Sequence, residues 1–405
     1  MVRFLGVLMF VLAACGGAAF PLAPPAEGAT SVKVCGSGFG HGVGLSQYGA
    51  YGRAKAGQGY ALILRSYYPG TSLKQYTDDP VVRVLLAQRA LSTSHDVVVS
   101  PGSTARLRNL ATDGTVSLNP GTYRIQYVSD SKAYRVTNVS TGRAVGSYTG
   151  PVIFEPISGS PLVHGGKRYR GTLAAQVSGS NLLLVNKVRL DDYVRGVVPK
   201  EMPASWAAEA LKSQAVAARS YARATLGGTA FDFYPDTRDQ VYGGVSAETA
   251  ATNSAVSATA RIHAVYAGNP ITAFFHSSGG GYTEDSAHVF SASPYLKAVR
   301  DVDGAGRPFE ARANSPWTRW TGTINPNGSP ELAIGEITNV RVLERTLSGR
   351  AKKVEVVGSR GSKVVTGQYE VRQRLNTMGL RRADGSSYPA GDLPSARASF
   401  GAACG

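Results

Sequence analysis

The sequence predicts an α+β protein in which strands predominate. Its 405 residues include 48 glycines and 20 tyrosines but only 4 methionines, a composition that favours turns and strands over a helical bundle. Short β-type runs bounded by Gly, Ser, Asn and Asp recur over residues 80–185 and again after residue 301. One long Ala-rich segment, from about Trp206 to Ala224, has helical spacing. Strand-rich regions on either side of a helical one indicate the α+β class.

The elements fall into four regions after an N-terminal leader. Residues 31–75 hold a Gly-rich segment, a helix-like stretch over Ser46–Ala56 and an aromatic run. Residues 80–185 are rich in strands, residues 186–300 mix helix and strand, and residues 301–405 return to strands. Ser205 is the expected N-cap of the long helix, and Gly227-Gly228 should end it. The strand-like runs are Val81–Leu86, Val97–Val99, Tyr123–Tyr127, Leu182–Val185, Val340–Leu343 and Lys352–Val357.

The chain is strongly basic, with 43 Lys and Arg against 27 Asp and Glu and a net charge of +16. Such a balance favours polyanionic partners, which include nucleic acid, anionic lipid and acidic cell-wall polymers. The basic residues are spread singly, without a basic helix or a basic-aromatic platform. This pattern argues against nucleic acid as the partner. Which of the other polyanions the protein meets depends on where in the cell it is located.

The first 29 residues are typical of a signal peptide. The apolar run Phe4–Leu12 is too short to span a bilayer. The segment Leu12–Gly16 resembles a lipobox in which Cys15 would be lipidated, and the alternative is ordinary cleavage near Gly28 or Ala29. Both alternatives predict an extracytoplasmic protein, secreted or lipid-anchored at the cell surface, that meets the membrane only through its leader or anchor.

The cysteine count agrees with export. If Cys15 is removed or lipidated, Cys35 and Cys404 remain, and an oxidising compartment allows them to pair. Two unpaired buried thiols are the alternative.

Glu201 is the strongest candidate for catalysis. Pro199 and Pro203 bracket it and predict a non-helical turn just before the long helix. The neighbours Met202 and Trp206 are apolar, so we expect the carboxylate at the edge of a hydrophobic pocket. Such a site disfavours the charged form and raises the pKa of Glu201, as a general acid requires. The alternative is an ordinary surface glutamate.

Four blocks of sequence carry a resemblance to a known family. They are the Glu201 turn with the small-residue helix Glu209–Ala222, the run Asp239–Gly244 followed by Ala255–Thr259, the run Phe274–Glu284 leading to Pro294–Leu296, and the run Gly38–Ala50 continuing into Ile63–Thr71. Together they resemble the SpoIID/LytB family of stage II sporulation protein D-like peptidoglycan lytic transglycosylases and amidase enhancers. The resemblance implies a SpoIID-like catalytic core, formed by residues 30–78 and 186–400, with a β-rich insert over residues 79–185.

The order of these blocks resembles a circular permutation. In many members of the family the Gly-rich block lies near the C-terminus, after a strand region similar to residues 350–380 here. If the fold is kept, the C-terminus of this chain should end near the start of the Gly-rich block. The resemblance therefore implies a Cys35–Cys404 disulfide that joins the two.

The Gly-rich block does not fit the known nucleotide-binding patterns. Glycines at offsets 0, 2 and 5 are absent, and no Gly-Lys-Ser/Thr ending follows. We interpret the glycines as allowing close approach of a sugar chain, with His41 and Gln47 as hydrogen-bonding groups. The alternative is a Gly-rich turn with a structural His41.

The family resemblance implies Glu201 as catalytic residue and a set of substrate-binding side chains. The set is His41, Gln47, Gln214, Arg219, Tyr242, His276, Ser277, Ser278, Thr283 and Glu284. A serine hydrolase built on the adjacent His276 and Ser277 is disfavoured, because neighbouring residues on a strand point to opposite faces and no nucleophile-elbow pattern is present.

The sequence predicts neither a metal nor another cofactor. Its histidines show no His-Glu-x-x-His spacing, and the cysteines show no Cys-x-x-Cys spacing. Some members of the family carry Cys or His before the Gln-Val-Tyr motif, where zinc can bind. The corresponding loop here, Asp232–Asp239, has neither.

Three functions remain open. The first is a lytic transglycosylase, which needs only one carboxyl group because the C6 hydroxyl of the muramoyl residue attacks its own anomeric carbon. A second carboxylate, for which Glu284 is the candidate, would instead permit hydrolysis. The resemblance implies peptidoglycan glycan strands without stem peptides as substrate. The second possible function is that of a non-catalytic amidase enhancer, with a cell-wall amidase as partner. The third is that of a structural wall-binding protein, which the net charge of +16 and the β-rich insert support.

Overall fold

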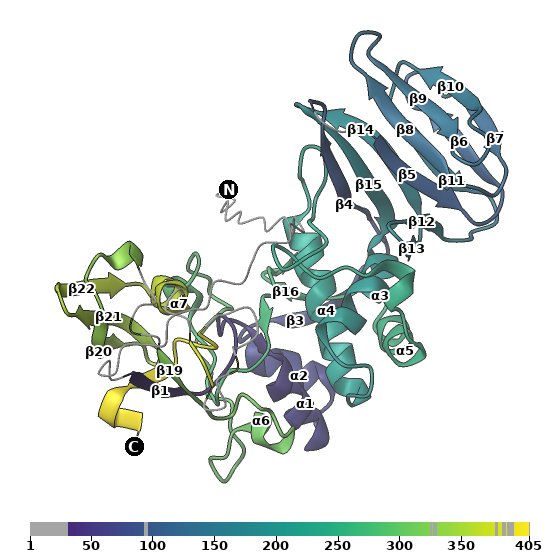
Figure 1. Ribbon diagram of the computed structural model, residues 1–405. Coiled ribbons are helices and arrows are strands. Elements are labelled where there is room, and N and C mark those ends of the chain that lie inside the picture. Colours follow the sequence, from purple (N-terminus) through teal and green to yellow (C-terminus); the bar gives the residue numbers. More distant parts are fainter. Residues whose placement is uncertain are drawn as a thin grey trace.

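The computed structural model describes residues 31–92, 96–324, 326, 330–376, 380–382, 386 and 393–404. The leader and its Cys15 lie outside the described residues. A β-sandwich, a helical part and a smaller C-terminal part follow one another across the molecule (Figure 1). The prediction of a β-rich α+β fold is confirmed.

The sandwich, from Val81 to Arg189, consists of two six-stranded antiparallel sheets. One sheet has the order β10-β9-β8-β5-β12-β13 and the other β4-β15-β14-β11-β6-β7. Inward side chains of both, such as Val97 and Leu184, join one core because apolar residues alternate along the strands. The strands are β4 (Val81–Ala90), β5 (Asp96–Pro101), β6 (Ala105–Asn109), β7 (Thr115–Leu118), β8 (Tyr123–Val128), β9 (Ala133–Asn138), β10 (Ala144–Tyr148), β11 (Val152–Pro156), β12 (Leu162–His164), β13 (Lys167–Tyr169), β14 (Thr172–Ser178) and β15 (Asn181–Arg189).

The helical part is built around α4 (Ala208–Thr225), the long Ala-rich helix that the sequence predicts. Its small buried side chains allow its neighbours to approach closely. They are α1 (Gln47–Lys55), α2 (Tyr60–Tyr67), α3 (Leu190–Glu201), α5 (Ala250–Ala258) and a sheet of β3 (Ser72–Gln75), β16 (Ile262–Tyr266) and β17 (Asn269–Pro270). The short elements nearby are β2 (Leu45–Ser46), paired in parallel with β18 (Phe275–His276), η1 (Gly244–Ala247), η2 (Ser286–His288) and α6 (Phe309–Arg312).

Two local predictions in this part are wrong. Glu201 is not in a turn: α3 continues through Pro199 and Glu201 is its last residue. Pro199 has no N–H to donate, so one hydrogen bond of the last turn is missing, and the helix ends two residues later. The helix α4 is also not capped by Ser205, since its N-cap is Ala207, without a side-chain hydrogen bond.

The C-terminal part has a hydrophobic core of its own. Its first sheet places the N-terminal strand β1 (Val32–Gly36) between β19 (Trp320–Ile324) and β23 (Ala398–Phe400). The second is the antiparallel β20 (Ile337–Arg345), β21 (Ala351–Gly358) and β22 (Gly361–Thr366). Near them lie α7 (Gln368–Asn376), η3 (Pro330–Leu332) and η5 (Gly401–Cys404).

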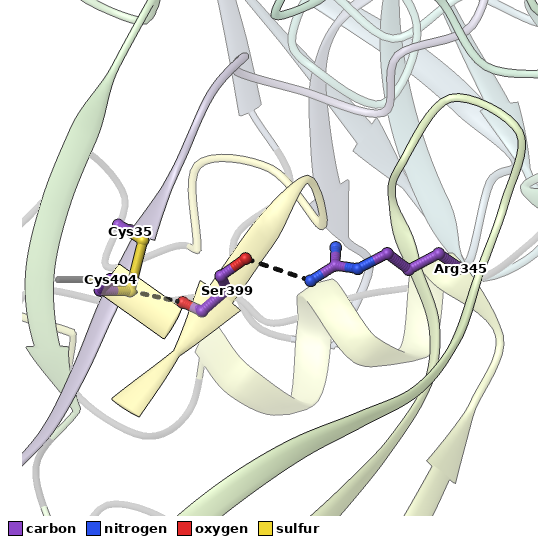
Figure 2. The surroundings of a disulfide bond; sticks show 4 residues. All are labelled: Cys35, Arg345, Ser399 and Cys404. Carbon is purple, nitrogen blue, oxygen red and sulfur yellow. Dashed lines mark hydrogen bonds between the residues drawn. A yellow bond between two sulfur atoms is a disulfide. The ribbon is translucent and has the colours of Figure 1, made fainter. Parts of the chain in front are cut away.

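The two ends of the described chain are joined by a disulfide between Cys35 and Cys404, as predicted (Figure 2). Cys35 lies opposite Ser399 in the β1–β23 pair, and the Cα atoms of the two cysteines are 5.5 Å apart. Arg345 donates a hydrogen bond to the Ser399 hydroxyl at 3.1 Å beside the bridge. The N-terminal Gly-rich segment thus begins beside the C-terminal strand.

Candidate active site

Glu201 lies where three segments distant in sequence meet. Its Oε1 accepts a hydrogen bond from the backbone N–H of Val241 at 3.0 Å. Its Oε2 accepts a longer one, of 3.4 Å, from Nε2 of Gln47. The side chain remains partly exposed, so the carboxyl group is held on both oxygens and still reaches solvent.

Gln47 connects the Gly-rich block to this carboxyl group. It is the first residue of α1, which is capped by Ser46, and its side chain is buried. The same Nε2 also donates to Oε1 of Gln214 on α4 at 3.4 Å. The structure therefore brings together three of the predicted site residues, namely Gln47, Glu201 and Gln214.

Burial sets the protonation behaviour of Glu201. Desolvation is the largest influence and raises the pKa of its carboxyl group above the ordinary value. The hydrogen bonds from Val241 and Gln47, together with the charge of Lys200, act in the opposite direction without cancelling it. A carboxyl group with a raised pKa retains a proton it can donate, which is the property required of a general acid.

An aromatic cluster adjoins Gln47. Tyr51 and Trp206 are stacked, with ring centroids 4.7 Å apart and an interplanar angle of 8°. Tyr48, next to Gln47 in the chain, packs against the same Trp206 at 4.8 Å. All three side chains are partly exposed, so they offer flat apolar surface near Glu201. Of these three residues the sequence indicates only Trp206 as a neighbour of Glu201, because Tyr48 and Tyr51 come from a distant helix.

Arg219 and Tyr242, predicted to bind substrate, belong to the framework instead. Arg219 is completely buried, with Nε 2.5 Å from the Asp191 carboxylate and a further hydrogen bond to the carbonyl of Ile262. Tyr242 is also buried and donates from its hydroxyl to Asn186 at 2.9 Å. A substrate cannot reach side chains whose surface and hydrogen bonds are taken up by the protein itself.

His41 is also committed to internal contacts. Its Nε2 is 2.9 Å from the carbonyl of Phe275, and its Nδ1 accepts from the N–H of Val43 at 3.0 Å. These two bonds define a neutral imidazole with the proton on Nε2. Burial is the main reason that the pKa of His41 is lowered to about 3. His41 therefore supports the Gly-rich block, as the structural alternative expected.

The Gly-rich block packs against protein, which corrects the interpretation of its glycines. Gly42 and Gly44 have positive φ angles. A side chain at Gly42 would meet the guanidinium of Arg350, and one at Gly44 would meet the carbonyl of Phe274. The close approach that these glycines permit is to the C-terminal part and to the segment before β18, rather than to a sugar chain.

The His276–Ser278 segment does not form a serine-hydrolase site. His276 is buried and lies 3.2 Å, through Nδ1, from the carbonyl of Val43. Ser278 is buried too and donates to Glu310 at 2.5 Å. Ser277 is partly exposed, and its carbonyl accepts from the N–H of Tyr48. The side chains of His276 and Ser278 thus bond to different partners, the carbonyl of Val43 and the carboxyl group of Glu310.

Glu284 does not serve as a second carboxylate for Glu201. It is completely buried, and its Oε2 accepts from the hydroxyls of Thr346 and Ser348 at 2.7 and 2.8 Å. Its Oε1 accepts from the N–H of Asp285 and lies 3.0 Å from Nδ1 of His288.

Its neighbour Thr283 is buried as well. The Thr283 hydroxyl donates to the carbonyl of Lys297 and accepts from the N–H of Val299. Both side chains therefore fix the segment after β18 in place, and their predicted contact with substrate is not supported.

Two buried ionisable groups, Glu310 and Arg350, were missed in the sequence. Arg350 donates to the carbonyls of Tyr282 and Gly279 after β18, and its guanidinium lies against Gly42 of the Gly-rich block. No sequence pattern around either residue predicts that it is buried, because the segments that surround it lie far away in the chain. In the described part of the chain no three His, Cys, Asp or Glu side chains are grouped so as to hold a metal ion. The absence of a metal or cofactor stays a prediction.

Comparison with known proteins identifies the segment that carries Glu201. Residues 178–266 match the family model described as SpoIID, stage II sporulation protein. The chain contains a SpoIID domain. This domain extends from the end of β14 to the end of β16, and it includes Glu201 and Gln214. Gln47 lies outside the matched range, so the described site includes a residue from beyond the SpoIID domain.

Several curated proteins are similar to this chain. The amidase enhancer of Bacillus subtilis is 50% identical over 111 residues, which are 27% of this chain and 15% of that protein. Stage II sporulation protein D of Bacillus subtilis is 38% identical over 174 residues, covering 38% of this chain and 51% of the relative. An uncharacterised protein of Brachyspira hyodysenteriae is 38% identical over 160 residues, covering 38% and 43%. The chain thus spans about half the length of these relatives or less.

Proposed function

We propose that this protein is a peptidoglycan lytic transglycosylase that cleaves the MurNAc–GlcNAc bond of glycan strands stripped of stem peptides. Glu201 is the group on which the proposal rests. It is partly exposed, it lies in the SpoIID domain, and burial raises its pKa. The names of two relatives, amidase enhancer and stage II sporulation protein D, support a role at the cell wall.

The proposed reaction uses Glu201 twice. The protonated carboxyl group first gives its proton to the glycosidic oxygen, and the bond between that oxygen and the muramoyl anomeric carbon breaks. The carboxylate then takes the proton of the muramoyl C6 hydroxyl, whose oxygen forms a new bond to the anomeric carbon. The products are a free GlcNAc 4-hydroxyl and a 1,6-anhydroMurNAc end, with no water consumed.

The surroundings of Glu201 support this one-carboxylate route. Hydrolysing glycosidases ordinarily use two carboxyl groups on either side of the bond. Glu284, the candidate partner, has both oxygens engaged by Thr346, Ser348, Asp285 and His288. It is therefore unavailable to activate water opposite Glu201. The partly exposed rings of Tyr48, Tyr51 and Trp206, a cluster in which Tyr48 follows Gln47 in the chain, offer stacking surface for sugar rings.

Location is part of the same proposal. A glycan-cleaving protein must act outside the cytoplasm, which agrees with the predicted leader. No helix among the described residues is long and apolar enough to cross a membrane. The net charge of +16 favours the acidic polymers of a wall as surroundings.

The alternative function is that of a non-catalytic amidase enhancer. The observation that favours it is the 50% identity to the Bacillus subtilis protein of that name. In this case the SpoIID domain would bind a cell-wall amidase and raise its activity, and Glu201 would not be required.

The first test compares purified, peptide-free glycan strands treated with wild type, Glu201→Gln and Glu155→Gln. Glu155→Gln removes the same charge from the sandwich, where Glu155 pairs with Arg108. We expect anhydro products, lighter by one water than hydrolytic fragments, from wild type and Glu155→Gln only. Glu201→Gln should reduce the rate by at least about 100-fold, since a general acid contributes that much, while binding to sacculi persists.

Other outcomes have distinct meanings. Reducing-end products would show a hydrolase. No products from any protein, with stimulation of an added cell-wall amidase by wild type and Glu201→Gln alike, would replace the proposal with the enhancer function.

A further inference from the structure

The amide groups of Gln47 and Gln214 form a pair beside Glu201 that leaves one donor unused. Gln47 donates both hydrogens of its Nε2, one to Oε2 of Glu201 and one to Oε1 of Gln214. Nε2 of Gln214 is buried and has no hydrogen-bond partner among the described residues. A buried donor without a partner is unfavourable, so this arrangement calls for an explanation.

The proton of Glu201 can reside on only one of its oxygens without loss of a hydrogen bond. Oε1 accepts from the backbone N–H of Val241, a group that can never act as acceptor. A proton on Oε1 would therefore oppose that N–H. The proton of the neutral acid belongs on Oε2, which faces Gln47.

A protonated Oε2 conflicts with the present orientation of Gln47, because two donors would face each other. A half-turn of the Gln47 amide removes the conflict by presenting its Oε1 to the new O–H. This would bring Oε1 of Gln47 against Oε1 of Gln214, two acceptors. A half-turn of Gln214 in the same step brings its unused Nε2 into a hydrogen bond with Oε1 of Gln47.

We propose that Gln47 and Gln214 are positioning residues for Glu201 whose two amides reverse together when Oε2 of Glu201 takes up its proton. The inference rests on Glu201 being the acid of the proposed function, although the coupling itself needs no substrate. Both protonation states of Glu201 are then hydrogen-bonded. The reversal also converts the unused donor of Gln214 into an unused acceptor, which buried sites tolerate more readily.

The ionisable groups near Glu201 do not take over the role of the Gln47 and Gln214 amides. Lys200, the preceding residue on α3, is a cation that favours the charged carboxylate. Tyr193 on the same helix is buried, and its raised pKa keeps its hydroxyl neutral through the range in which Glu201 titrates. Neither α1 nor α4 supplies an ionisable group among those that shift Glu201, and their contacts to it come through the two amides.

The coupling can be measured by NMR titration of the full chain, isotope-labelled in glutamine side-chain amides and glutamate carboxyl groups. We expect the side-chain NH₂ signals of Gln47 and Gln214 to shift with the same midpoint as the Glu201 carboxyl signal. Gln176, which lies in the sandwich on β14 and donates to the carbonyl of Ala230, is the control and should not respond. Gln47→Met and Gln214→Met assign the signals.

The comparison with Glu201→Gln decides the result. Both amide signals should become independent of pH when Glu201 cannot titrate. A Gln214 signal that stays constant while Glu201 titrates would overturn the inference, whether or not the protein cleaves glycan. Coupled amides in a protein that yields no anhydro products would instead leave the inference standing and remove the transglycosylase function.

Discussion

At the scale of single residues, Glu310 is a carboxyl group outside the site with an unusual environment. It is completely buried, and its Oε2 accepts from the Ser278 hydroxyl at 2.5 Å and from the N–H of Gly280 at 3.1 Å. Its Oε1 has no hydrogen-bond partner in the described part of the chain. Desolvation, reinforced by the nearby charge of Asp301, raises the pKa of Glu310 to about 7.

This raised pKa predicts a dependence of stability on pH. Below pH 4.5, the pKa of this group in the unfolded chain, Glu310 is protonated in both the folded and the unfolded protein and does not lower the free energy of unfolding. As the pH rises from there to about 7, only the unfolded chain loses the proton, so the free energy of unfolding falls, by about 3 kcal/mol in total. Glu310→Gln should lack this contribution. We expect its stability relative to wild type, measured by urea denaturation, to improve from pH 4.5 to pH 8; parallel curves would contradict the assignment.

At the scale of elements, an ion pair fixes α3 against α4. Asp191 in the first turn of α3 meets Arg219, which lies inside α4 with no exposed surface. Arg219 also donates to carbonyls of Val256 at the end of α5 and Ile262 on β16. Since Glu201 is the last residue of α3 and Gln214 lies on α4, this pair helps to hold the two side chains in register.

Loss of the carboxylate partner should destabilise the helical part. Asp191→Asn leaves the buried guanidinium without its counter-charge, and we expect the free energy of unfolding to fall by about 3 kcal/mol. Glu331→Gln, which breaks the exposed pair with Arg374, is the control and should leave the Tm unchanged. Thermal denaturation of the two variants makes the comparison. An equal change of Tm in both variants would show that the buried Asp191–Arg219 pair stabilises the protein no more than an exposed ion pair does.

At the scale of the whole molecule, the two ends of the described chain complete one sheet. Strand β1 lies between β19 and β23, so the C-terminal part cannot form its first sheet without the N-terminal strand. From β1 the chain runs through the Gly-rich block into α1, whose Gln47 reaches Glu201. The N-terminal segment therefore links the C-terminal part to the site.

The Cys35–Cys404 bridge spans 369 residues of sequence and should stabilise this closure. We expect Cys35→Ser/Cys404→Ser to unfold with a free energy lower by about 3 kcal/mol, because the disulfide restricts the unfolded chain. Urea denaturation with and without reductant measures this. Reductant should destabilise the wild type and leave the double variant unaffected; a wild type indifferent to reductant would contradict the prediction.

Elements with strong local patterns could be predicted from the sequence. The Ala-rich helix and strands such as β4 and β15 lie where composition and period place them, because these signals depend on neighbouring residues alone. Glu201 was indicated both by its apolar neighbours and by the family resemblance, and the Cys35–Cys404 disulfide followed from the resemblance. The helix α2 was not predicted, and the continuation of α3 through Pro199 was predicted wrongly, because packing against neighbouring helices outweighs local preference.

The sequence by itself therefore determined the fold class, the family resemblance and the residue on which the proposed chemistry rests. Only the tertiary structure decided which other candidates lie beside that residue. It placed Gln47 and Gln214 at Glu201 and turned Arg219, Tyr242 and Glu284 into buried framework. The physical reason is that burial and hydrogen-bond partners come from segments far apart in the chain, and no local pattern encodes them.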